Sequence, residues 1–296
     1  MQSEKRWCVY TNEWYPSDEM TDDHVIPLSL GGHDQLTIRV SKRGNAEANR
    51  SLDEPICRHP FVAFMRMTHK IVGRRDEIPN VKWPTKVGDA PGIINWSKPK
   101  VELATFRSKG RCAINMTRVL DKGEAISSEG TFDTDLLTRF GCRLALGASY
   151  HLFGDVFREH GYHNELRDLM RAPNSVKLLG FKRQNMVGDS PFWGIAWPES
   201  PDDIDPLWGE IAKRTHGHLV FTDHSPERIV LGIVLFEGFF QWYFNISKDP
   251  SKFPAGGAFD LGSATEIRFD PLTIRRTDLR SYLEPAFKDL LAVKTR

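Results

Sequence analysis

The sequence predicts an α+β protein, and three stretches of the chain carry this prediction. Residues 133–171 repeat apolar side chains at three- and four-residue steps, which is typical of amphipathic helices. Beyond residue 191 the pattern changes to β, with apolar segments at 219–222, 228–236 and 239–246. Near the N-terminus, two short extended segments precede a helix-like one. We therefore expect a small N-terminal motif, followed by a larger C-terminal part in which a helical layer covers an antiparallel sheet.

The composition is that of a folded globular chain. With 296 residues, 40% of them hydrophobic, the chain can form one large or two modest domains. No window approaches the roughly 18 unbroken apolar residues of a membrane span, and residues 1–7 lack the apolar core of a signal peptide. The four cysteines follow no pairing rhythm. We expect a cytoplasmic protein with reduced thiols and no membrane contact.

Residues 22–32 hold the most informative pattern in the chain. Asp23 directly precedes His24, Pro27 ends a β-branched step, and a pair of glycines opens a loop. We expect strands at 21–27 and 36–40, joined by the polar loop 28–35. A short helix is predicted over 45–54, with Asn45 as its N-cap and Pro55 at its end.

Asp23-His24, Ile26-Pro27, Gly31-Gly32 and Asn45 together make this stretch resemble the HNH endonucleases, whose core is a ββα-metal motif. The resemblance covers about the first 55 residues. It implies that His24 is the general base, and that Asp23 and Asn45 bind one divalent cation, expected to be Mg²⁺ with Mn²⁺ as a possible substitute. Asn49 and His33 are possible accessory residues, and Asp53 is expected to pair with a basic side chain.

Many relatives carry a zinc knuckle made of two Cys-x-x-Cys pairs. The equivalent positions here are Cys8, Thr11, Ser41 and Gly44, so one thiol of four is present. A structural zinc site needs about four ligands, and we expect none here. Instead, we expect aromatic side chains to pack where zinc would hold the loops; these are Trp7, Tyr10 and Trp14.

The implied chemistry suits the residue types. A divalent ion relieves negative charge on a phosphate, and Mg²⁺ keeps several waters, so one carboxylate and one amide oxygen suffice from the protein. A neutral imidazole can take the proton from a water molecule. Consecutive residues of a strand point to opposite faces. Asp23 and His24 can therefore share one site only where the strand ends or bends, as Pro27 and the glycine loop suggest.

Basic residues follow this motif. Between Arg66 and Arg118 there are 12 Lys/Arg and 4 Asp/Glu, although the whole chain has a net charge of +1. Lysine and arginine supply most of the sequence-independent affinity for nucleic acids. We expect DNA as the partner, although a solvated surface segment would show the same charge. The candidate contacts are Arg43, Arg66, Lys70, Arg74 and Arg75.

The resulting domain prediction has three parts: a nuclease domain at 1–58, a basic connecting segment at 59–120, and a C-terminal α+β domain of unknown role at 121–296. The predicted function is a metal-dependent DNA endonuclease. Two alternatives stay open, a nucleic-acid-binding module whose nuclease site has decayed, and a nuclease effector gated by a ligand. A second histidine cluster could bind metal, but its ligand set is partial; it comprises His216, His218, Asp223 and His224.

Overall fold

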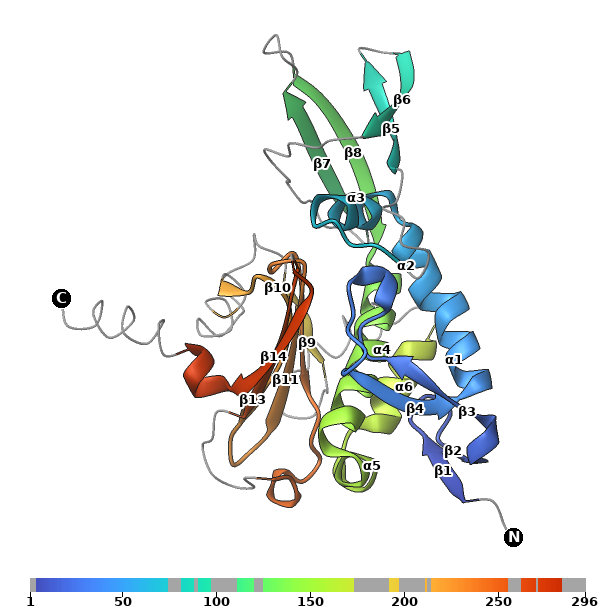
Figure 1. Ribbon diagram of the computed structural model, residues 1–296, viewed down its shortest axis with the longest axis vertical. Helices are drawn as coiled ribbons and strands as arrows, with labels where there is room; N and C mark the ends of the chain where they lie inside the picture. The colour runs from blue at the N-terminus through green and yellow to red at the C-terminus, as the bar shows by residue number, and fades with distance from the viewer. Residues whose placement is uncertain are drawn as a thin grey trace, which may run out of the picture.

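The structure is a computed structural model that describes residues 4–73, 81–87, 90–96, 111–119, 125–172, 192–196, 211, 214–254, 262–269 and 271–283. It confirms the α+β class, with helices and antiparallel sheets. Helices α4 to α6 lie between a six-stranded sheet and the N-terminal strands (Figure 1). No helix in these ranges combines the length and apolar character needed to cross a membrane.

The N-terminal part begins with two hairpins. Strand β1 (Lys5–Cys8) pairs with β2 (Glu13–Pro16), and β3 (Met20–His24) pairs with β4 (Thr37–Ser41), both antiparallel. Short 3₁₀ turns lie at Ser17–Glu19 and Leu28–Leu30. Helix α1 (Lys42–Ala48) follows β4 directly. Two strands and a helix thus occur in the order that the sequence predicts.

The start and end of the predicted helix were wrong. Ser41, not Asn45, is the N-cap, because its hydroxyl accepts the N–H of Gly44 at 3.1 Å. Pro55 does not stop the helix either. A π-helical segment (Asn49–Asp53) leads without a break into α2 (Glu54–Arg58), and Pro55 lies in the first turn of α2. Helix α3 (Pro60–Thr68) comes next.

The helical layer agrees with the periodicity of residues 133–171. It consists of α4 (Thr134–Phe153), α5 (Asp155–His160) and α6 (His163–Arg171). Asp133 caps α4 by accepting the N–H groups of the next turn. Gly154 ends α4 with a φ of +52°, a backbone conformation that favours glycine.

The three β segments predicted after residue 191 fall in the centre of the six-stranded antiparallel sheet, whose strand order is β14-β13-β10-β11-β12-β9. A tight turn joins the segments 228–236 and 239–246, where the Phe239 N–H donates to the Phe236 carbonyl at 3.1 Å. The strands are β9 (Phe192–Ala196), β10 (Gly217–His224), β11 (Ile229–Leu235), β12 (Phe240–Asn245), β13 (Ser263–Arg268) and β14 (Thr273–Asp278).

Helix α4 joins the N-terminal strands to the sheet through one core. A single cluster of buried apolar side chains runs from Trp7 to Phe269. At Gly141 the helix approaches the sheet so closely that a Cβ atom would stand 2.5 Å from the Trp242 indole. On another side, Gly147 faces the hairpin, where a Cβ atom would stand at an ordinary contact distance of 3.6 Å from Ile38. The boundaries at 58 and 120 stay predictions, and this core crosses both of them.

Between these parts, the backbone forms two further hairpins; their first three strands fall in the predicted connecting segment 59–120, and the fourth lies after it. Strand β5 (Val81–Val87) pairs with β6 (Ala90–Trp96), and β7 (Arg111–Val119) pairs with β8 (Ala125–Asp133). Both lie beyond α3 at one end of the molecule (Figure 1).

Candidate active site

The four positions that the HNH resemblance aligns with a zinc knuckle meet at the base of the β3–β4 hairpin. The Cys8 sulfur accepts the Ser41 N–H at 3.2 Å and lies 3.3 Å from the Ser41 hydroxyl. A Cβ atom on Gly44 would stand 3.1 Å from the Thr11 methyl group and 3.3 Å from the Cys8 sulfur. Small side chains and hydrogen bonds therefore fill the position where the resemblance would place a zinc ion.

The aromatic prediction for this region is confirmed in part. Trp7 and Tyr10 are buried in the core. Trp14 is 53% exposed, so it does not pack inside. Its ring instead lies 5.0 Å from the Arg158 guanidinium, a cation–π contact on the surface.

Asp23 faces inward, toward α4. Its Oδ2 accepts hydrogen bonds from the Tyr10 hydroxyl and from Arg143 Nη2, each at 2.8 Å. Arg143 is fully buried and also lies 3.1 Å from Asp53 Oδ2, while its Nη1 donates to the Val25 carbonyl. The prediction that Asp53 pairs with a basic side chain is confirmed. We call Tyr10, Asp23, Asp53 and Arg143 the inner-face cluster.

Burial governs the titration of the inner-face cluster. Desolvation raises the pKa of Asp53 to about 6, although the Arg143 charge opposes the rise. Desolvation alone would lower the pKa of Arg143, but the neighbouring Asp53, Tyr10 and Asp23 raise it above its ordinary value. Arg143 is therefore permanently charged, and the carboxylates of Asp23 and Asp53 compensate its positive charge.

His24 lies at the end of β3 on the face opposite to Asp23, and 14% of its side chain is exposed. Its Nε2 lies 2.9 Å from Oδ1 of Asp34, an exposed loop residue. The hydrogen bond from His24 lowers the pKa of Asp34. Because a carboxylate only accepts, we assign the proton of the neutral ring to Nε2 and leave Nδ1 as the basic nitrogen. A carboxylate that orients an imidazole in this way prepares it to act as a base.

Residues of the C-terminal part bind the hairpin at the end where His24 lies. Thr37 is the cross-strand partner of His24, and its carbonyl lies 2.8 Å from Nδ1 of His151 on α4. Arg276 on β14 donates to the Gln35 carbonyl at 2.8 Å and lies 3.1 Å from His151 Nε2. Sequence reasoning missed His151 and Arg276, because 114 and 241 positions separate them from their partners.

The predicted metal ligands do not converge with the predicted base. Asp23 and His24 both belong to the regular β3–β4 ladder, opposite Ile38 and Thr37, so they face opposite sides. The bend that would bring them together is not present there. Asn45 is half-buried on α1. A cation shared by Asp23 and Asn45 would also stand beside the Arg143 guanidinium, so this donor set does not fit the expected metal site.

The accessory residues lie at separate places. Asn49 is exposed where the π-helical segment begins. His33 is in the loop after the two glycines, where its Nδ1 accepts the Gln35 N–H at 3.2 Å.

The candidate DNA contacts are spread over two elements. Arg43 is exposed in the first turn of α1, and Lys70 is exposed just after α3. Arg66 is partly buried in α3, and burial lowers its pKa. Arg74 and Arg75 lie outside the described residues.

The second histidine cluster does not form a metal site among the described residues. His218 is fully buried, with Nε2 donating to the Leu30 carbonyl at 2.6 Å and Nδ1 accepting the Phe236 N–H at 3.1 Å. Burial lowers the pKa of His218 to about 3. His216 precedes β10 and is exposed. His218 thus ties the glycine loop to the sheet.

We compared the chain with known protein families, curated proteins and solved structures, and found no match. The functional interpretation therefore depends on the residues themselves: a buried carboxylate cluster on one face of a hairpin, and an imidazole–carboxylate pair on the other.

Proposed function

We propose that this protein is an HNH-type endonuclease that hydrolyses phosphodiester bonds in DNA, with His24 as its general base. The observation that carries the proposal is the His24–Asp34 pair on the outward face of a hairpin that leads directly into a helix. The meeting of Cys8, Thr11, Ser41 and Gly44 supports it, since the resemblance aligns these positions with one knuckle.

The described residues supply two of the needs of this reaction. The basic Nδ1 of His24 can take a proton from an attacking water, while Asp34 holds the ring in one tautomer. Negative charge on the phosphate has to be relieved as well. The Arg276 guanidinium, bonded to the loop beside Asp34, is a cation suited to that task. The dependence on Mg²⁺ or Mn²⁺ is a proposal that the resemblance supports, without the ligand pair Asp23 and Asn45.

A second candidate function is a nucleic-acid-binding module that no longer cleaves. The Asp23–Arg143 ion pair favours it, because a guanidinium neutralises the carboxylate that the resemblance assigns to a metal. In that case the basic side chains would bind the phosphate backbone, and the histidine pair would have no reaction to perform.

A plasmid-cleavage assay separates the two functions. Supercoiled DNA is incubated with Mg²⁺, Mn²⁺ or a chelator, and wild type is compared with His24→Ala. The matched control is His160→Ala, which removes a histidine of α5 that lies 4.0 Å from Glu159. We expect nicking that His24→Ala abolishes and His160→Ala preserves. DNA retention without cleavage under every condition would establish the binding module instead.

A further inference from the structure

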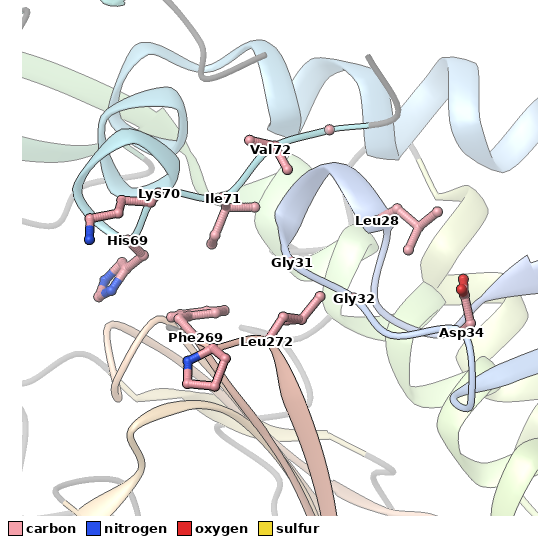
Figure 2. Close-up of a pocket in the computed structure, with 12 residues that line it drawn as sticks. Leu28, Gly31, Gly32, Asp34, His69, Lys70, Ile71, Val72, Phe269 and Leu272 are labelled. Atoms are coloured by element: carbon pink, nitrogen blue, oxygen red, sulfur yellow. The ribbon is translucent and has the colours of Figure 1, made fainter. Parts of the chain in front are cut away.

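A cavity of about 420 Å³ lies next to the His24–Asp34 pair and has no role in the proposed hydrolysis (Figure 2). Three parts of the chain form its walls. These are the glycine loop with Gly31 and Gly32, the segment after α3 from His69 to Gly73, and the turn between β13 and β14. Asp34 lines the cavity and bonds His24 at 2.9 Å, so the two sites share a residue.

The walls of the cavity are mainly apolar. Ile71 and Phe269 lie on opposite sides of it, with Leu272 beside Phe269 (Figure 2). Gly31 has a φ of +91°, and a Cβ atom there would stand 2.9 Å from the Phe269 ring. The glycine therefore lets the loop backbone pack directly against these walls.

The rim of the cavity exposes apolar surface to solvent. Val72 is 43% exposed and Leu272 is 53% exposed. Among the residues that the structure describes, the only other large hydrophobic side chain so exposed is Trp14. Exposed apolar surface around a concave site is typical of ligand binding.

Polar groups stand at separate places on this apolar cavity. The Asp34 carboxylate lies on the side of the glycine loop, and Lys70 and His69 lie on the far side (Figure 2). The His69 ring centroid is 4.9 Å from that of Phe269. Burial lowers the pKa of His69, so that its ring is neutral at pH 7 and can both donate and accept hydrogen bonds. The cavity thus presents apolar faces, one carboxylate, one imidazole and one ammonium group.

We propose that this cavity binds a nucleobase, taken out of the base stack, from the strand that is cleaved at the His24 site. The inference rests on the proposed function. A base is a flat heterocycle that stacks on aromatic and aliphatic side chains and has polar edges. Successive nucleotides of one strand are only about 3.4 Å apart along a duplex, so the nucleotide beside the attacked phosphodiester can reach a cavity that begins at Asp34. A stacked base cannot enter it, so the base comes from extrusion or from a single strand.

The test uses 2-aminopurine, whose fluorescence rises when it leaves the base stack. A duplex with this base beside the cleavable position is titrated with the His24→Ala protein, which keeps the DNA intact. We expect a saturable rise in fluorescence. Leu272→Trp fills the cavity from its exposed rim and should weaken the effect at least tenfold. Thr273→Trp is the matched control, because the neighbouring Thr273 is exposed and does not line the cavity.

Competition identifies the source of the base. Deoxynucleoside monophosphates that suppress the signal would show that free nucleotides also enter the cavity, and failure to suppress it would show that only a strand delivers the base. Either result supports the inference. The absence of any fluorescence rise, or equal effects of Leu272→Trp and Thr273→Trp, would overturn it. Plasmid cleavage without the fluorescence signal would remove this inference alone, while the signal without cleavage would remove only the endonuclease.

Discussion

The two faces of the β3–β4 hairpin carry adjacent residues in opposite environments. On the inner face, Asp23 is buried against Tyr10 and Arg143. On the outer face, His24 contacts Asp34, whose carboxylate is open to solvent. The alternation of a strand separates them although they are neighbours in sequence. In this dipeptide, Asp23 belongs to a buried ion pair, and His24 provides an imidazole on the opposite face.

The difference shows why a motif alone does not define a site. A buried ion pair gains little over an apolar replacement, but removing one partner leaves a charge without compensation in the interior. An exposed pair contributes little to stability, because water screens it. Substitutions on the inner face should therefore affect folding, and substitutions on the outer face should affect reactivity.

The largest effect is expected from Arg143→Met on the inner face. It leaves the Asp23 and Asp53 carboxylates buried without their cation, and should lower the free energy of unfolding by about 3–5 kcal/mol. Urea unfolding measures the loss. Arg158→Met is the matched control, since Arg158 pairs at the surface with Asp155 and should change stability by under about 1 kcal/mol. Equal losses of unfolding free energy in the two variants would contradict the prediction that the buried ion pairs of Arg143 matter more than a surface pair.

Lowering the pH should decrease the free energy of unfolding through His218, which ties the glycine loop to the sheet. Its pKa is about 3 in the folded protein and about 6.5 in an unfolded chain. Its contribution is therefore complete above pH 6.5 and declines by about 1.4 kcal/mol for each pH unit as the pH falls toward 3. The raised pKa of Asp53 acts in the opposite direction, because its carboxyl binds a proton more readily when folded.

The comparison of wild type with His218→Gln isolates this histidine from Asp53. Urea unfolding between pH 7 and pH 4 should show a shallower decline in the variant, even though the variant is less stable at pH 7. Parallel curves for the two proteins would show that His218 does not titrate as described.

On the outer face, Asp34→Ala should slow DNA cleavage about tenfold, part of the ~10²–10⁴ that a positioned base contributes. Asp34→Asn should retain more activity, because its amide oxygen can still accept the His24 Nε2–H and hold the tautomer. Urea unfolding should be unchanged in both variants, since Asp34 is exposed. A stability loss as large as that of Arg143→Met would break the distinction between the faces.

The smallest effect is expected at the base of the hairpin. Cys8→Ala removes a buried sulfur that accepts from Ser41, and should cost about 1 kcal/mol. A zinc chelator should leave the melting temperature of wild type unchanged, because three of the four knuckle positions lack a thiol. The triple variant Thr11→Cys, Ser41→Cys and Gly44→Cys sharpens this test. It should bind Co²⁺ with the absorption of a tetrahedral thiolate site, and a chelator should then lower its melting temperature.

Local patterns predicted much of the fold. Periodicity located α4 and the central strands. The helix start was wrong because Ser41, which follows the strand without a gap, competes with Asn45 as a cap. The packing of Trp14 was also wrong, since nothing in its local sequence distinguishes a buried indole from one covered by Arg158.

The sequence by itself determined the hairpin and the helix after it. These follow from hydrogen bonding and alternation over a few residues. Only the tertiary structure decided which partner each side chain meets. Arg143 reaches Asp23 across 120 positions, and Arg276 reaches the loop across 241. Such contacts depend on how α4 and the sheet pack into the shared core, and packing geometry leaves no periodic signal in the chain.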